Sequence, residues 1–575
     1  MKIKRIISAF LLIAVLLSAL SACTPAAQVP EESGTIAPVE TPPADPGESG
    51  DLGEATMPEE PEIEKPANPE KTLFQKSNET YGSGVLGCTG LTLLAEYNRG
   101  VDFDIKSYKD GTNKIYYLFL PCRADLSSVT FTVTHKDGSE SGPYTADFSD
   151  DEVTENEKTI GGINTYSIVV MQSNLPTVML QIDEQYGTIK NMNGDASHET
   201  YSYGKMVATV TNEMAAEKGW ATRYESLDED AARACSMRIR GRGNATWSYP
   251  KKPYHMVLEN DVDLFGMGSA NKFVFLANVK DAAGMRTQLA LDMGILSGIE
   301  YTSESRQVDL FMNGEYLGMY QIAEKVEAGV NRVEIDQNED ILFEKDNYAK
   351  EEPIFGFQTD YVNGNKRGFR IISPEDETMV ESCKSKLIKA EIALYGKDDE
   401  QFEKYFDLES WAKMYLLQMF TMNSDSYYGS LYFYYNGDDG KLYACSPWDF
   451  DWSLGVSWGG TSFYTDPMQY DVGKIEWIKP MLTHRNFLEA VVKAYYEGGV
   501  KEAIEAMPAL VDKYGEENRA SAMMNQVIND IYYYPKDIDN YEDSVAYIRE
   551  ICVKRAVFLE NLMRSYATIF KYKVD

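Results

Sequence analysis

Two hydrophobic periodicities follow one another along the chain, and their order limits the fold. Short runs that alternate apolar and polar residues end with residues 307–312 and 318–323, which Asn313-Gly314 joins. An Asn-Gly pair between such runs is the strongest short-range signal of a β-hairpin. Beyond Arg485 the apolar spacing is helical nearly to the end of the chain. A sheet followed by helices predicts an α+β fold with an antiparallel sheet and a helical C-terminal part.

The same patterns place the other elements of this part of the chain. Asp407 is expected to cap one helix over residues 408–421, and a second helix is expected over residues 282–296. Further strands are predicted at residues 177–182, 205–211, 236–240, 254–259 and 272–277, with a hairpin over residues 430–445.

Residues 72–173 are predicted to form a separate β-sandwich-like domain. Alternating runs at residues 114–119, 129–134 and 166–171 are separated by turn signals such as Lys136-Asp-Gly138. No grouping of reactive side chains occurs here, which favours a spacer or a ligand-binding module.

The first residues of the chain have the pattern of an export signal. Lys2, Lys4 and Arg5 precede a short apolar stretch that ends in small residues. This pattern predicts a secretory signal peptide over residues 1–22, too short to span a membrane comfortably. Leu20-Ser-Ala-Cys23 resembles a bacterial lipobox, which implies a lipid on Cys23 and an extracytoplasmic protein anchored to the bacterial cell membrane. The alternative is an ordinary signal peptide followed by a stray cysteine.

Proline and acidic residues dominate residues 23–71. A segment with so few apolar side chains cannot bury enough surface to offset the entropy of ordering, so an extended, disordered tether is expected. Six other cysteines follow in what is predicted to be an oxidising compartment. Their spacing selects no pairing, and Cys88 with Cys122 is the candidate disulfide.

The charge of the chain excludes one class of partner. The sequence has 90 acidic and 55 basic side chains, a net charge of −35, which would repel a nucleic acid. Its four histidines lie far apart, and no HExxH or CxxC spacing occurs. Zinc-dependent hydrolysis and a Ser/His/Asp triad are therefore not expected.

One segment concentrates positive charge in this acidic chain. Arg242 and Lys252 lie with other cations in residues 238–254, beside Gly241 and Gly243. Glycines let backbone amides approach a bulky anion, so the segment has the composition of a phosphate cradle. The alternative is an ordinary turn with a solvated face.

Two carboxylates follow the predicted hairpin. If Asp449 and Asp451 continue its second strand, both point to one face about 6–7 Å apart. Carboxylates that close repel each other unless a cation or a proton lies between them. Mg²⁺ fits, because it uses one or two carboxylates together with substrate phosphates. A pair of turn or capping aspartates is the alternative.

A third candidate is Asp425, in the polar loop between the helix at residues 408–421 and the hairpin. A lone aspartate in a loop is usually a turn residue. Here, however, the order of helix, Asp, hairpin and second Asp is the order in which protein kinases present the catalytic base and the metal ligand.

Taken together, several segments resemble the spore-coat CotH kinase family. The resemblance implies that residues 174–575 form a divergent protein-kinase-like domain that binds ATP and Mg²⁺. It also implies phosphorylation of Ser or Thr of the protein itself or of partner proteins of the cell envelope or coat. The segments are Arg242-Gly-Asn-Ala-Thr-Trp247 with Pro250-Lys-Lys-Pro-Tyr254, Asn278-Val-Lys-Asp281 before Arg286, the stretch from Val308 to Tyr320, Asn423-Ser-Asp425 and Pro447-Trp-Asp-Phe-Asp451.

The family's roles carry over by position. Asp425 would orient or deprotonate the attacking hydroxyl, and Asp449, with Asp451, would hold Mg²⁺. Ser430 stands where the family usually has an asparagine that binds metal, and no glutamate in residues 270–298 is available to pair with a lysine of the cationic segment. The residues expected at the nucleotide are Arg242, Gly243, Lys252 and Glu324.

Two other functions fit parts of the sequence. A non-catalytic adhesin or scaffold of the envelope or coat would also carry a lipid, a tether and a β-domain. A carbohydrate-active enzyme would also place paired acids near tryptophans. The spacing of Asp449 and Asp451 on one side and the cationic segment speak against the second.

Overall fold

The computed structural model describes residues 77–81, 88–149, 155–160, 166–226, 236–346, 355–359, 367–423, 425, 429–456, 477–529, 531 and 538–574. The predicted signal peptide, Cys23 and the tether lie outside these residues. The residues considered below belong to one compact unit, Pro66–Asp575. Among them, no helix is both long and apolar enough to cross a membrane.

The first part of this unit consists of two sheets around a shared hydrophobic core. Phe131 and Val133 of β6 lie in that core, and the threonines on either side of Phe131 are also buried, so both faces of this strand are covered. One sheet has the order β1-β8-β9-β5-β4 and the other the order β3-β2-β6-β7. The strands are β1 (Ser77–Tyr81), β2 (Cys88–Leu93), β3 (Ile105–Lys106), β4 (Tyr108–Asp110), β5 (Ile115–Leu120), β6 (Val129–His135), β7 (Glu140–Ala146), β8 (Glu155–Ile160) and β9 (Tyr166–Gln172).

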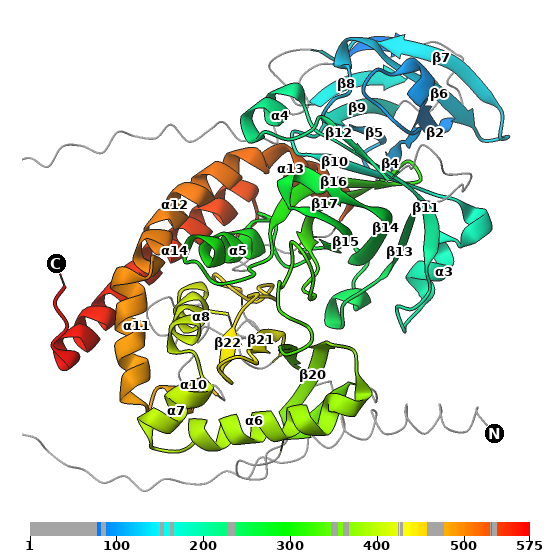
Figure 1. Cartoon of the computed structure of the whole chain (residues 1–575). Helices are drawn as coiled ribbons and strands as arrows, with labels where there is room; N and C mark the ends of the chain where they lie inside the picture. Colours follow the sequence, from blue (N-terminus) through cyan, green and yellow to red (C-terminus); the bar gives the residue numbers. More distant parts are fainter. Residues whose placement is uncertain are drawn as a thin grey trace, which may run out of the picture. The chain divides into compact units, whose positions relative to one another are not determined.

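The second part is a closed β-barrel. β10 pairs antiparallel with β11 and parallel with β16, so the ring β10-β16-β17-β15-β14-β13-β11 returns to its first strand, and β12 adds to β11 outside the ring. Helices α3 (Ile189–Gly194) and α4 (Asn212–Lys218) lie in its connections. The strands are β10 (Thr177–Ile182), β11 (Ser202–Thr209), β12 (Arg223–Glu225), β13 (Met237–Gly241), β14 (Tyr254–Asp263), β15 (Ser269–Leu276), β16 (Ser305–Met312) and β17 (Glu315–Glu324) (Figure 1).

The barrel corrects the fold predicted from the sequence. The expected divergent protein-kinase-like domain, with an antiparallel sheet and a helical C-terminal part, is wrong on two counts. The sheet is closed and contains a parallel pair, and a second sheet lies within the C-terminal part. Hydrophobic alternation identifies strands but does not say which edges meet. Closure depends instead on long-range contacts, such as the bond from the Ile182 amide to the Asn313 side chain at 2.6 Å.

The third part combines a five-stranded sheet with helices. The sheet has the order β19-β20-β18-β21-β22. Its strands are β18 (Ile341–Lys345), β19 (Gly356–Thr359), β20 (Arg367–Ser373), β21 (Leu431–Tyr435) and β22 (Leu442–Ala444). The helices are α5 (Arg286–Leu296), α6 (Val380–Leu394), α7 (Asp399–Tyr405), α8 (Leu408–Thr421), α10 (Ile478–Met481), α11 (Arg485–Glu497), α12 (Val500–Glu517), α13 (Arg519–Ile528) and α14 (Tyr541–Phe570).

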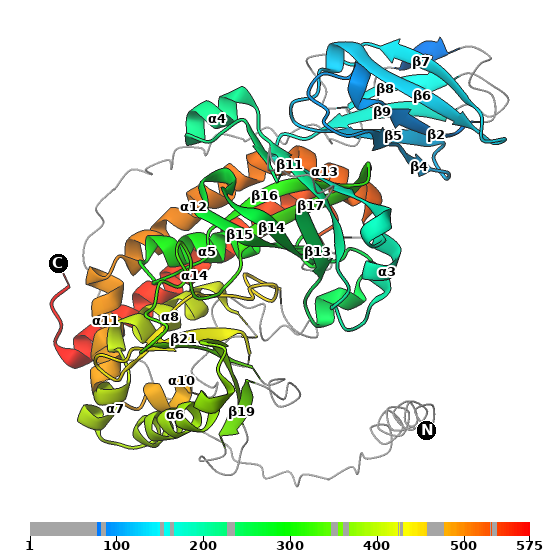
Figure 2. The same ribbon diagram turned by 45° about the vertical axis from the view of Figure 1, so that its right-hand side comes forward.

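Helix α8 runs through the centre of this part. Asp407 caps it as predicted, because its carboxylate accepts a hydrogen bond from the Ser410 amide at 2.8 Å. Most of its side chains are buried in one core with α11, α14 and the second sheet. The long helices α12 and α14 run side by side, with α5 packed against α12 (Figure 2). Such a fully packed helix is a rigid support for the loop at its C-terminal end.

The candidate disulfide between Cys88 and Cys122 is wrong, because Cys122 is a free, buried thiol. Its Sγ donates to the Thr209 carbonyl on β11 at 3.7 Å, and its amide donates to Thr177 on β10. Burial raises the pKa of Cys122 to about 11. The side chain therefore joins the first part of the unit to the barrel without a covalent bond.

Candidate active site

A cleft of about 1220 Å³ brings together most of the residues that the sequence singled out. Its walls come from β13 and the loop after it, from α5, and from strands β18, β20 and β21 of the second sheet. Six of the predicted site residues line it: Arg242, Gly243, Asp425, Ser430, Asp449 and Asp451. Lys252 and Glu324 are not among the described residues that line this cleft.

Asp425 is held just beyond the end of α8. Met422 ends the helix in the left-handed conformation, with φ of 54°. The next residue, Asn423, is buried and uses both ends of its amide. Its Oδ1 accepts from the Asp425 amide at 3.0 Å, and its Nδ2 donates to the Asp449 carbonyl at 3.0 Å. Asn423 thus fixes the backbones of the two candidate catalytic segments relative to each other, a role that sequence reasoning did not assign.

Asp449 and Asp451 do not continue a strand, contrary to the prediction. β22 ends at Ala444, and Asp449 has a φ of 65°. Ser430, across the cleft wall, also has a positive φ, and its hydroxyl donates to Asp449 Oδ2 at 3.1 Å. Non-glycine residues in this conformation are uncommon and concentrate at functional sites. The carboxylates share the cleft because of loop geometry and not because of strand alternation.

The carboxylates destabilise one another's charge. Burial, together with the charge of Asp449, raises the pKa of Asp425 to about 6 and that of Asp451 to about 7. Removal from bulk water also raises the pKa of Asp449, against which the Ser430 hydroxyl and Arg242 act. Clustered carboxyl groups with perturbed pKa values are characteristic of functional sites.

A buried ion pair supports the loop that carries the two aspartates. Arg286 at the start of α5 is 1% exposed, and its Nη1 lies 2.5 Å from Asp281 Oδ1. The Nε of Arg286 donates to the Leu454 carbonyl at 3.1 Å, and the Leu454 amide donates to Thr421 at the end of α8. The Asn278-Val-Lys-Asp281 motif therefore acts through Arg286 to fix the loop, rather than by contacting a substrate.

The charge of Arg242 acts on both members of the acidic pair, Asp449 and Asp451. Its guanidinium lies 5.9 Å from the centre of the Trp448 ring. Burial lowers the pKa of Arg242, and Asp449, Asp451 and Glu344 act in the opposite direction. A guanidinium on an aromatic face keeps its outer donors available for an oxyanion.

The two glycines of the cationic segment, Gly241 and Gly243, are required for different physical reasons. Gly243 has a φ of 84°, a conformation that favours glycine, and it lines the cleft. Gly241 is needed for packing instead, since a Cβ there would lie 2.4 Å from the Trp247 ring.

Lys252 contacts Trp247, the same tryptophan. Its ammonium donates to the Trp247 carbonyl and lies 4.8 Å from the centre of that ring. The neighbouring Lys251 is buried, donates to the Met319 carbonyl, and has its pKa lowered to about 7 by burial. The structure thus gives both lysines contacts within the fold, away from the cleft, whereas the sequence analysis had expected Lys252 at a phosphate.

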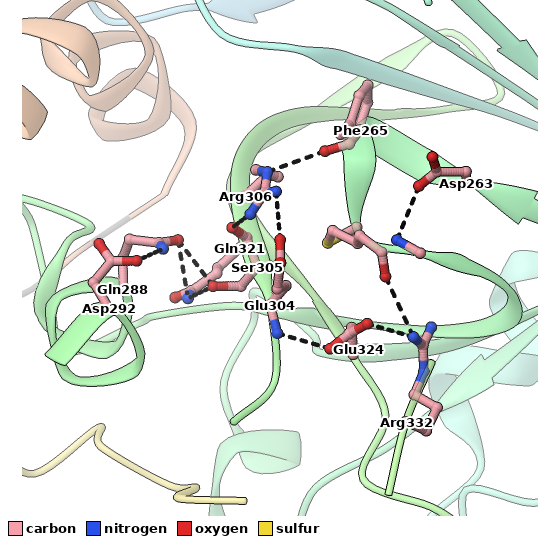
Figure 3. A network of polar contacts seen from close by, with 12 residues as sticks. Asp263, Phe265, Gln288, Asp292, Glu304, Ser305, Arg306, Gln321, Glu324 and Arg332 are labelled. Atoms are coloured by element: carbon pink, nitrogen blue, oxygen red, sulfur yellow. Dashed lines mark hydrogen bonds and ion pairs between the residues drawn. The ribbon is translucent and has the colours of Figure 1, made fainter. Parts of the chain in front are cut away.

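Glu324 lies in a separate network at the end of β17 (Figure 3). Its carboxylate accepts from the Glu304 amide at 2.8 Å and pairs with Arg332. Burial raises the pKa of Glu324 to about 7, and Arg332 opposes that shift. Glu324 lines a small cavity of about 250 Å³ rather than the cleft.

The residues that follow Glu324 border a second cavity of about 670 Å³ that adjoins the cleft. Lys325, Val326 and Glu327 form one side of it. The two cavities share seven lining residues: Arg240, Arg242, Glu344, Phe355, Arg370, Tyr432 and Trp448. The cationic part of the cleft that contains Arg240, Arg242 and Arg370 is therefore its junction with the second cavity.

Four of these shared residues were missed by the sequence analysis: Glu344, Phe355, Arg370 and Tyr432. Glu344 on β18 and Arg370 on β20 approach to 4.0 Å, and Arg370 also pairs with Asp346 at 3.1 Å. Burial raises the pKa of Glu344 to about 7, and Tyr432 is hydrogen-bonded to it. The available signal was a charged residue inside an otherwise apolar strand, as in residues 341–345.

Among the described residues, no three His, Cys, Asp or Glu side chains are arranged as a metal site. The oxygen donors that line the cleft include those of Asp449, Asp451, Asp425 and Ser430. A hard cation with few protein ligands suits such a set, provided that a substrate supplies further oxygens.

Residues 239–559 match the family model described as CotH kinase protein. The match covers more than half of the chain and contains every cleft residue discussed above. The chain belongs to the CotH kinase protein family. Among curated proteins, no relative matches it. CotH membership indicates a kinase-related function. The CotH match leaves out the first β-rich part and the barrel strands β10, β11 and β12.

Proposed function

We propose that this CotH protein transfers the γ-phosphoryl group of ATP, with Mg²⁺, to serine or threonine hydroxyls of itself or of partner proteins. The observation that carries the proposal is the convergence of Asp425, Asp449, Asp451 and Arg242 in one cleft. Phosphoryl transfer requires positioning and charge neutralisation more than covalent chemistry, and these four side chains are of the types needed for both.

The two adjoining cavities provide a place for each part of the nucleotide. The second cavity is lined mostly by charged and polar side chains, among which Val274, Val326 and Ile372 would pack against a flat base. Arg242 lines both cavities, so a triphosphate that runs from the second cavity into the cleft passes this guanidinium. Arg242 would bind the phosphates, and the Gly243 backbone would allow their close approach.

The donor set fits Mg²⁺ brought in with the nucleotide. Asp449 and Asp451 would hold the ion, with the Ser430 hydroxyl hydrogen-bonded to Asp449 and so restricting its rotation. When bound, Mg²⁺ would neutralise charge on the phosphates. Burial raises the pKa values of the two carboxyls more than Arg242 lowers them, and a bound cation would favour their charged forms further.

Asp425 would act on the acceptor hydroxyl. The Asn423 side chain fixes its backbone, and its carboxylate lies in the cleft. With a pKa raised to about 6, Asp425 is ionised at neutral pH and is a better proton acceptor than an ordinary aspartate. It would orient the hydroxyl and take its proton as the oxygen attacks phosphorus.

The experiment that tests the proposal is transfer of label from γ-labelled ATP to the protein itself and to dephosphorylated casein. It should be measured from pH 5 to pH 8 with Mg²⁺ and with EDTA. Because Asp425 must be unprotonated and its pKa is about 6, kcat/KM should fall as pH drops through 6. The expected loss between pH 8 and pH 5 is about tenfold or more. No transfer at any pH would refute the proposal, and a flat profile would remove Asp425 as the base.

The site of action is proposed from the sequence. The signal peptide and Cys23 would place the protein outside the cytoplasm, on a lipid anchor with the acidic segment as a tether. Acceptors would then be proteins of the envelope or coat.

A further inference from the structure

A loop outside the family match forms part of the cleft wall. Residues 195–201, between α3 and β11, precede the matched region, which begins at residue 239. Ser197, His198, Glu199 and Tyr201 of this loop nevertheless line the cleft.

The loop is tightly built. The Asp195 carboxylate accepts from the amides of Ser197, Glu199 and Thr200 at 2.8 to 2.9 Å, and from the Ser197 hydroxyl at 2.7 Å. These bonds hold the loop around the side chain of Asp195, which does not itself line the cleft. Asp195 therefore sets the conformation of the loop without facing the cleft.

Contacts from the cationic segment, residues 238–254, hold residues 195–201 in place. Arg240 donates through Nη1 to the His198 carbonyl at 2.6 Å and through Nε to the Tyr201 hydroxyl at 3.1 Å. The Trp247 indole donates to the Asp195 carbonyl at 3.1 Å, and the His198 ring packs against it at 4.9 Å. Trp247 follows Gly243 in the segment proposed for the phosphates. A movement of the loop would therefore shift Trp247 and with it the phosphate-binding segment.

The lining of the two cavities indicates which substrate residues 195–201 would contact. Residues that line both cavities surround the proposed path of the triphosphate. The loop residues line the cleft but not the second cavity, and the same is true of Asp425. A nucleotide whose base fills the second cavity leaves the part of the cleft that the loop and Asp425 line open for the acceptor.

We propose that residues 195–201 form the acceptor-binding wall of the cleft and that Asp195 is a positioning residue that holds this wall in shape. The inference rests on the proposed function, because it assumes transfer from ATP to a protein hydroxyl. His198, Glu199 and Tyr201 offer an imidazole, a carboxylate and a phenol to the segment around that hydroxyl. A wall outside the family match allows acceptor choice to change without change in the residues that act on ATP.

The test compares acceptor and nucleotide kinetics in Asp195→Ala and His198→Ala. In each variant the KM for dephosphorylated casein should rise about fivefold or more, while the KM for ATP stays within about twofold of wild type. Asp137→Ala is the matched control, because Asp137 caps a turn through Ser139 in the same way, in the hairpin between β6 and β7. It should change neither constant.

Each outcome decides the matter. An equal rise of both KM values, or a rise for ATP alone, would assign the loop to the nucleotide and overturn the inference. Unchanged constants in both variants would also overturn it while leaving the proposed function intact. If the wild-type protein transfers no label to casein or to itself, the proposed function fails, and the inference fails with it. His198→Ala retains the Asp195 bonds, so a folding defect confined to Asp195→Ala does not obscure the result.

Discussion

Asp425→Asn is expected to lower phosphoryl transfer about 10³-fold while leaving the affinity for MgATP within about twofold of wild type. Asparagine has nearly the same shape but cannot take a proton from the acceptor hydroxyl. The backbone bond from residue 425 to Asn423 does not involve the side chain that is replaced. The loss should therefore appear in kcat, measured as label transferred from γ-labelled ATP.

Asp438→Asn is the matched control for this substitution. Asp438 is an exposed carboxylate in the turn between β21 and β22 and does not line the cleft. It should transfer label at the wild-type rate. If Asp425→Asn keeps more than about a tenth of the wild-type rate, Asp425 is not the base.

The second large effect concerns folding. Arg286→Met should lower the free energy of unfolding by about 3–5 kcal/mol, because it leaves Asp281 buried without its cation. Asp281 is 7% exposed, so water cannot replace the lost charge easily. The change should be visible as an earlier midpoint in urea unfolding.

Two controls separate burial of charge from loss of a side chain. The surface pair Arg549–Asp512 has side chains 49% and 55% exposed, so Arg549→Met should cost only about 0–1 kcal/mol. The double variant Arg286→Met with Asp281→Asn should be more stable than Arg286→Met alone, since no uncompensated charge remains. An Arg286→Met protein within about 1 kcal/mol of wild type would contradict the role given to this pair.

Elements governed by local rules were predictable from the sequence. Helix α8 spans the predicted residues 408–421 because a capping aspartate precedes a sustained apolar pattern. The hairpin of β16 and β17 turns at Asn313 and Gly314, which have φ of 48° and 80° as a tight primed turn requires.

Features that depend on distant contacts were not predictable. Nothing in residues 177–182 says that this strand pairs with both β11 and β16 and so closes the barrel. Asp449 and Asp451 reach the cleft because Asp449 has a left-handed backbone conformation, whereas strand alternation wrongly predicted that they continue β22. Lys252 lies against Trp247, five residues earlier, because the loop folds back on itself.

In the candidate site, too, features set by local sequence were predictable and features set by distant contacts were not. Its acidic residues could be predicted, because residue type and order along the chain indicate their chemistry. The part of the cleft formed by the second sheet could not. Glu344 and Arg370 lie on β18 and β20, two strands that the sequence analysis did not predict. Arg240, expected only as one more cation of a phosphate cradle, proves to be bonded to His198 and Tyr201.

The central claim is that distant acidic and cationic segments bind a magnesium–triphosphate group together. The most direct test is the thermal unfolding midpoint of the purified protein with ATP, with and without Mg²⁺. MgATP at about 100 times its Kd should stabilise the wild-type protein by about 2.7 kcal/mol. Asp449→Ala should lose that gain and Asp438→Ala should retain it. Equal stabilisation of wild type and Asp449→Ala, or equal stabilisation in EDTA, would contradict the claim.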